Sequence, residues 1–238
     1  MSVNIRLLTL TVQSQLAIDL NCNPDDFNKE GLIFCESKVN PGRRPFPREE
    51  RHLDILTMGK AIIVSATPDI MPNIQEQLQG KSRDEAFAMP FVYTTAHYYL
   101  PTDIKPLQKP TDYDYEFVEG TDIHKLYVYK EFENCMQYDI NHPRPDVLIL
   151  TAKKDGKIIA MAGASADGED MWQIGIDVLP EHRQTGLAAY LTSCLAIEIL
   201  ARGKVPYYCT SSSNIASQRV AFRSGFSPAW VCTYKTLI

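Results

Sequence analysis

The stretch from Val178 to Ala188 constrains the fold of this chain more than any other. An apolar run predicts a strand that ends at Val178, and a second apolar run predicts a helix from Leu187 onward. Arg183, Gly186 and Ala188 lie between or at the start of these elements as Arg-x-x-Gly-x-Ala. The first N–H groups of a helix lack partners and its dipole favours negative charge, so this turn can bind phosphate. Gly186 would let a pyrophosphate approach the backbone closely.

Two familiar phosphate motifs do not describe this turn. A dinucleotide fingerprint requires Gly-x-Gly-x-x-Gly, and a P-loop ends in Gly-Lys-Ser/Thr. The alternative to a phosphate site is an ordinary turn between a strand and a helix with an exposed arginine, and the sequence context decides between them.

Composition limits the classes of protein that this chain can belong to. Its 238 residues allow one large or two small domains, and a net charge of −5 gives no electrostatic case for nucleic acid. The six cysteines are scattered without a Cys-x-x-Cys pair, and the five histidines show no metal-ligand spacing. We expect free thiols in a reducing compartment and no metal. The start of the chain does not resemble a signal peptide, and no stretch approaches the roughly 18 apolar residues that span a bilayer, so we expect a cytoplasmic protein that does not bind a membrane.

The amino-terminal half reads as a mixed α/β domain over residues 1–100, with a role that the sequence does not indicate. We predict helices over 7–20, through Leu53 and Leu56 to Gly59, and from Thr67-Pro68 to Gly80. A capped turn is predicted at 23–26 and a capping box at 82–85. Strands are predicted at 61–64 and 91–95. A proline-rich stretch at 101–111 is then predicted to be a linker.

In the carboxy-terminal half, residues 112–238, the pattern predicts a clear succession of strands and helices. We predict a strand at 113–117, a helix over 121–136, and three antiparallel strands at 147–151, 158–162 and 171–179. The buried helix 187–202 follows, and a strand at 205–210 should run parallel to its predecessor because a helix connects them. A helix ending at Gly225 and a strand at 229–236 complete the chain.

This order, together with two motifs, resembles the GNAT superfamily of N-acyltransferases. The first motif is the turn described above, and the second is Asn214-Ile215-Ala216-Ser217 followed by Gly225-Phe226. The stretch 172–178 and the region from Asn214 to Trp230 are similar to GNAT proteins of the zwittermicin-resistance type. The resemblance implies an α/β (α+β) fold with a mixed, mostly antiparallel sheet flanked by helices.

The resemblance also implies that acetyl-CoA is a cosubstrate and that a primary amine, expected to belong to a small molecule, attacks it directly. The backbone near Ile176 and Val178 would contact pantetheine, and a backbone N–H near Val178 would stabilise the oxyanion. Asn214 and Ser217 would lie beside the pantetheine or cysteamine. The pyrophosphate would be held by the turn, namely by Arg183, Gln184, Thr185, Gly186, Leu187 and Ala188.

The sequence departs from the family at the positions of the acid and the base. The tyrosine that many members use as an acid is replaced by Ala221, and a glutamate on the strand before the turn is replaced by Ile174 and Gly175. Positioning and the oxyanion donor can supply much of the rate without them. The polar groups nearest these places are the candidates for proton transfer, namely Asp177, Gln173, Tyr208 and Ser211, followed by Cys209 and Ser212.

Two other functions remain open at this stage: a non-catalytic acyl-CoA-binding or sensing module, and acetylation of a peptide or protein amine. The domain also has room for only one strand after Phe226, where the family commonly has two. We therefore expect the amino-terminal domain, or a second chain in a homodimer, to complete the sheet.

Overall fold

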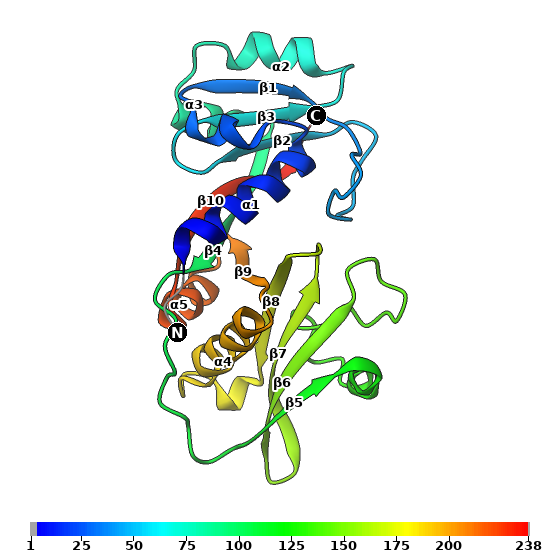
Figure 1. Ribbon diagram of the computed structural model, residues 1–238, viewed down its shortest axis with the longest axis vertical. Helices are drawn as coiled ribbons and strands as arrows, with labels where there is room; N and C mark the ends of the chain where they lie inside the picture. The colour runs from blue at the N-terminus through cyan, green and yellow to red at the C-terminus, as the bar shows by residue number, and fades with distance from the viewer. Residues whose placement is uncertain (1–3, 238) are drawn as a thin grey trace. The chain divides into compact units, whose positions relative to one another are not determined.

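The computed structural model describes residues 4–237, and these residues divide into two compact units (Figure 1). The carboxy-terminal unit consists mainly of Tyr99–Cys209 and Ile215–Ser227. The amino-terminal unit consists of Arg6–Tyr98, Thr210–Asn214 and the chain from Pro228 onward. Both units are therefore assembled from segments that are distant in the sequence.

The amino-terminal unit is a small sheet with helices. Its strands follow the order β1-β3-β2-β10, where β10 is Phe226–Thr236 near the end of the chain. Strand β1 runs parallel to β3, and the other neighbours are antiparallel. Ile55, Ile62 and Val64 lie in its core beside Ile74 and Leu78 of a helix. The elements are α1 (Ile5–Leu20), η1 (Pro24–Asn28), β1 (Leu32–Glu36), β2 (Leu53–Thr57), β3 (Ile62–Ala66), α2 (Met71–Leu78), α3 (Arg83–Phe87) and β4 (Val92–Pro101).

The structure corrects the predicted helix through Leu53 and Leu56, because this segment is strand β2. A hairpin with a left-handed Gly59 (φ +112°) returns the chain so that Leu53 pairs with Ala66 and Thr57 with Ile62. The apolar pattern of this short segment fits either a helix or a strand, and its pairing with distant strands makes it a strand. Strand β1 was not predicted from the sequence, and α2 begins at Met71 rather than at Pro68. The predicted first helix, the capped turn and the Ser82 capping box are confirmed.

The carboxy-terminal unit has the predicted mixed, mostly antiparallel sheet flanked by helices. Its strand order is β9-β8-β7-β6-β5, and the β8–β9 pair is parallel, as predicted. The elements are β5 (Asp114–Glu119), η2 (Gly120–Val128), β6 (Asp146–Lys154), β7 (Lys157–Ala166), β8 (Met171–Val178), η3 (Pro180–His182), α4 (Leu187–Ala201), β9 (Val205–Ser211) and α5 (Ile215–Arg223).

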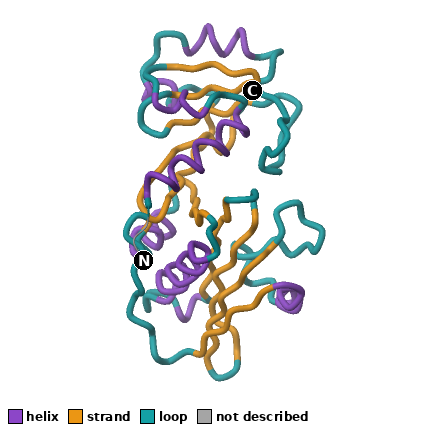
Figure 2. The backbone as a smooth tube through the Cα atoms, viewed as in Figure 1, coloured by secondary structure: helices purple, strands orange, loops and turns teal. Residues whose placement is uncertain are grey.

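The two faces of this sheet carry different structures. On one face α4 lies along the strands and buries Leu191 and Leu195 against Leu150 and Ala162 (Figure 1). On the other face the predicted helix 121–136 is replaced by the short 3-10 helix η2 and a loop (Figure 2). Phe132, Cys135 and Met136 of this loop are buried against this face.

Strand β4 supplies the strand that the carboxy-terminal sequence lacks, because the strand order places it between β10 and β9. In the carboxy-terminal unit, the N–H groups of Thr102 and Asp103 donate to the Gly225 carbonyl, at 3.0 and 3.1 Å. In the amino-terminal unit, the ring of Tyr98 stacks on Trp230 with centroids 4.7 Å apart. Within the carboxy-terminal unit, residues that precede residue 112 thus contact the chain at the end of α5.

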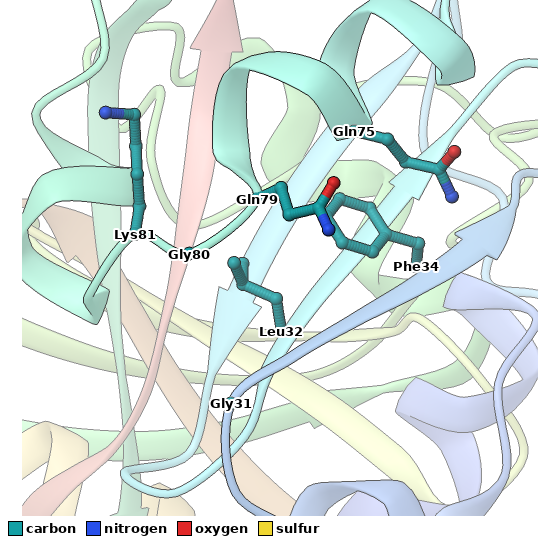
Figure 3. Close-up of a pocket in the computed structure, with 7 residues that line it drawn as sticks. All are labelled: Gly31, Leu32, Phe34, Gln75, Gln79, Gly80 and Lys81. Carbon is teal, nitrogen blue, oxygen red and sulfur yellow. The ribbon is translucent and has the colours of Figure 1, made fainter.

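The amino-terminal unit also contains a pocket of about 600 Å³ (Figure 3). Leu32 and Phe34 of β1 form its apolar floor, and Gln75, Gln79 and Lys81 border it. This pocket includes none of the residues predicted to bind a cofactor. Among residues 4–237, no helix combines the length and the apolar character that crossing a bilayer requires.

Candidate active site

Backbone pairing between the parallel strands β8 and β9 stops halfway along β8. The register runs from Met171 opposite Val205 to Ile174 opposite Tyr208, and β8 continues without this partner to Val178. The last part of β8 therefore has one edge that β9 does not cover.

The hydrogen-bond pattern on the other edge of β8 shows which backbone groups face this uncovered side. The Leu179 N–H donates to the Ile159 carbonyl at 2.9 Å, so Val178 and Ala160 form a pair that exchanges no hydrogen bonds. In an antiparallel ladder such a residue turns its N–H and C=O away from its partner strand. The backbone groups of Val178 and, two residues earlier, Ile176 are thus presented where β9 pairing has ended, as the prediction of a pantetheine contact requires.

The turn after β8 ends in a helix N-terminus that no side chain caps. Gln184 (φ +64°) and Gly186 (φ +84°) adopt left-handed conformations, and Gly186 is the N-cap of α4. The first helical hydrogen bond runs from the Tyr190 N–H to the Gly186 carbonyl at 3.0 Å. The N–H groups before Tyr190 precede this bond, and they are the donors that a helix leaves for an anion.

Side chains of the turn are arranged around these donors. Arg183 donates from Nε to the Val178 carbonyl at 2.9 Å, which links the guanidinium to the end of β8. The Thr185 hydroxyl donates to the His182 carbonyl at 2.9 Å. Residues 183–186 are exposed, whereas Leu187 is buried and Ala188 is half-buried. The turn is therefore accessible to an anion and anchored by the apolar start of the helix.

The missing glutamate has a steric explanation. A Cβ atom on Gly175 would lie 1.8 Å from the Asn134 carbonyl oxygen, and one on Gly163, its partner on β7, would lie 1.7 Å from that of Cys135. The loop before β6 thus occupies the space that a side chain at this position of β8 would need. Ala221, at the position of the usual acid, is fully buried in the core beneath α4.

Asp177 is held by the same loop. Its Oδ2 accepts the Asn134 backbone N–H, and its Oδ1 accepts the Asn134 Nδ2, both at 2.6 Å. Asp177 is half-buried and Asn134 is exposed. Asn134 was not predicted as a site residue, since nothing in the sequence indicates that a residue so far from β8 would reach it.

Gln173 and Tyr208 are the other predicted candidates on these strands, and both have partners. The Tyr207 hydroxyl donates toward Gln173 Oε1 at 3.2 Å and also contacts the buried carboxylate of Asp167. The Tyr208 hydroxyl lies 2.8 Å from the Ser217 hydroxyl, and burial raises its pKa to about 12. Tyr208 therefore stays protonated at neutral pH and can only donate a proton.

The remaining predicted residues, Ser211 and Asn214, belong to the amino-terminal unit. The Ser211 hydroxyl lies 3.1 Å from that of Ser213, and the Asn214 N–H donates to the Ser211 carbonyl at 3.0 Å. They form the turn that precedes α5. Within the described residues, no group of three or more His, Cys, Asp or Glu side chains is arranged to hold a metal ion.

The family follows from this fold and from a direct match. Residues 113–226 match the family model of the Acetyltransferase (GNAT) family. Residues 113–226 are therefore a domain of the GNAT superfamily.

Solved structures with this fold are distant in sequence. A GNAT-family acetyltransferase from Colwellia psychrerythraea is 15% identical with a TM-score of 0.51, over 98% of this chain and 74% of that chain. A protein assigned to the GNAT family from Novosphingobium aromaticivorans is 20% identical with a TM-score of 0.44, over 59% of this chain and 63% of that chain. The aminoglycoside N-acetyltransferase AAC(6')-Iy, solved in complex with CoA, is 24% identical with a TM-score of 0.38, over 49% of this chain and 92% of that chain. No curated protein matches the chain.

Proposed function

We propose that this protein is an acetyl-CoA-dependent N-acetyltransferase that moves the acetyl group to a primary amine of a small molecule. The observation that carries this proposal is the end of β8–β9 pairing at Ile174, followed within one strand and one turn by the uncapped start of α4. An extended pantetheine could pair with the exposed backbone edge, while its pyrophosphate binds the turn.

In this proposal the residues of the carboxy-terminal unit have separate roles. Ile176 and Val178 bind pantetheine through their backbone, and the Val178 N–H stabilises the oxyanion as the amine attacks the thioester carbon. Arg183 and the N–H groups of residues 184–188 bind the pyrophosphate. Ser217, bonded to Tyr208, faces the cysteamine end. The prediction that Asn214 contacts the cofactor stays a prediction.

The domain assignment is part of the same proposal. Residues 112–238 would form the acyl-CoA-binding catalytic domain, with residues 101–111 as a linker and residues 1–100 as an α/β domain. Its support is that the sheet edge, the turn and the loop of Asn134 all lie after residue 112. A cytoplasmic location and a homodimer remain predictions from the sequence.

Binding of acetyl-CoA to a Gly186→Glu variant tests the pyrophosphate assignment. A Cβ on Gly186 meets no atom within 4 Å, so the variant adds a negative charge to the turn without a steric clash. We expect calorimetry to show affinity at least about tenfold weaker, since hydrogen bonds to charged groups contribute about 1.5–3 kcal/mol. Gly203→Glu is the matched control, because Gly203 (φ +73°) is also left-handed and open but follows the end of α4. Equal affinity in the two variants would refute the assignment.

A second function is favoured by one observation: neither the usual base position nor the usual acid position carries a reactive side chain. The space beside Gly175 is filled by backbone, and Ala221 is in the core. A module that binds acyl-CoA without turning it over would have these features. Release of free CoA in the presence of a panel of small amines and peptides separates the functions, because binding without release identifies the module. Release with peptides alone would identify a peptide or protein amine as the acceptor.

A further inference from the structure

The loop between η2 and β6 crosses the sheet at its one pair of facing glycines, Gly163 and Gly175. Phe132, Cys135 and Met136 are buried against Ile149 and Met161, so the loop is anchored on both sides of residue 134. The side chain of Asn134 itself is exposed. Its backbone is therefore fixed by packing, while its side chain lies at the surface.

Two hydrogen bonds from Asn134 hold the carboxylate of Asp177 in one orientation. A half-buried aspartate on a strand could rotate about two side-chain bonds, but here each oxygen accepts a separate hydrogen bond at 2.6 Å. One donor is backbone, and the other is the side-chain amide. A functional group held in this way by a packed loop loses little entropy when it acts.

Three other titratable groups interact electrostatically with Asp177. Cys135, Tyr138 and Tyr208 are the titratable groups whose charges it influences, and burial raises the pKa of all three. Each therefore stays protonated and neutral through the acidic and neutral range. On Asn134's own loop, Glu133 is an exposed neighbour.

We propose that Asn134 is a positioning residue that orients the Asp177 carboxylate to receive a proton from the acceptor amine, an inference that rests on the proposed function. The amine nitrogen forms a bond to the thioester carbon, and the C–S bond breaks with its electron pair on the sulfur of CoA. The N–H proton passes to the Asp177 carboxylate. Asp177 then returns the proton through solvent to the CoA thiolate, so the products are the amide and CoA.

In this proposal Asp177 has the role of the glutamate that is absent at Gly175, and it lies two residues further along β8. Residues 173, 175 and 177 alternate onto the same face of the strand. Because backbone fills the space beside Gly175, the carboxylate at 177 takes its orientation from the residue that fills that space.

Two substitutions at Asn134 test the assignment against a merely structural role. In N134A the hydrogen bond from the backbone N–H to Asp177 remains, and the hydrogen bond from the side-chain amide is lost. We therefore expect kcat/KM for the amine to fall about tenfold while the Kd of acetyl-CoA is unchanged. N134D places a second carboxylate beside Asp177. Two carboxylates that share a site resist full ionisation, so the low-pH limb of the kcat/KM profile should move to higher pH. Glu133→Ala is the control in the same loop and should keep the wild-type profile.

The possible outcomes are distinguishable. Wild-type kcat/KM and an unchanged profile in both N134A and N134D would overturn the positioning role, whatever the effect on melting temperature. If N134D does not fold, as judged by circular dichroism, the kinetics of N134A decide alone. Wild-type protein that releases no CoA with any amine would overturn the proposed function, and the positioning role with it, whereas turnover with insensitive variants overturns the positioning role only.

Discussion

Gly163 and Gly175 lie directly opposite each other on β7 and β8, and the carbonyls of Cys135 and Asn134 pass over them where Cβ atoms would otherwise be. This contact joins the loop before β6 to β8, the strand that precedes the turn at Arg183 and Gly186. It explains why the chain has no glutamate there, and it brings Asn134 to Asp177. Packing and the candidate chemistry thus depend on the same two glycines.

Gly175→Ala should destabilise the protein more than any exposed glycine substitution. Its Cβ would lie 1.8 Å from a backbone oxygen, so the loop or the strand must shift. Overpacking of this kind costs about 1–3 kcal/mol or more, and we expect a loss near the top of that range in denaturant unfolding. Gly203→Ala carries only the cost of a left-handed alanine, about 1–2 kcal/mol. A smaller loss for Gly175→Ala than for Gly203→Ala would contradict the steric account.

Removal of residues 1–110 should give insoluble protein. The deletion removes β4, which lies between β10 and β9 in the strand order, and leaves unpaired backbone along apolar strands. Exposed edges of this kind promote aggregation. The measurement is the soluble fraction after expression and size-exclusion chromatography of residues 111–238 beside the full chain. A monomeric, folded fragment would show that β4 is dispensable.

Cys35 should react with iodoacetamide at lower pH than Cys22 and Cys194. The hydrogen bond from Cys22 favours the Cys35 thiolate and lowers the pKa of Cys35 below its ordinary value of 9.0. The same interaction raises the pKa of Cys22. Because the thiolate is the reacting form, the midpoint of Cys35 alkylation, followed by peptide mass spectrometry, should lie below pH 9.0.

The direction of this shift can be checked with one variant and one internal control. Cys22→Ala removes the hydrogen bond, so the midpoint for Cys35 should rise. Cys194 is the control, because burial raises its pKa and its midpoint should lie above 9.0. A Cys35 midpoint at or above that of Cys194 would show that the two thiols do not interact.

The parts of the fold that were predictable are those with local signals. The strand, turn and helix around Arg183 and Gly186 were predicted because glycine, proline and long apolar runs act on their immediate neighbours. The parallel β8–β9 pair followed from the helix that connects them. In contrast, Leu53–Thr57 is too short for its pattern to separate strand from helix, and only its pairing with β3 and β10 decides it.

The candidate site also has a part that could be predicted from the sequence and a part that could not. The turn that would bind pyrophosphate could be located from the sequence, because its donors are consecutive backbone groups. The partners of the candidate side chains could not: Asn134 meets Asp177 across a sequence separation of 43 residues, and Tyr207 meets the buried Asp167 across 40. Neither pair has a local pattern that a sequence could display.

By itself, the sequence indicated the family of residues 113–226, the order of most elements after residue 112 and the turn between β8 and α4, because these depend on interactions between near neighbours in the chain. Only the tertiary structure decided that β4 completes the sheet, that backbone fills the space beside Gly175, and that Asn134 holds Asp177. These features depend on which distant segments pack together, and the side-chain periodicity of a single segment carries no information about its distant partner.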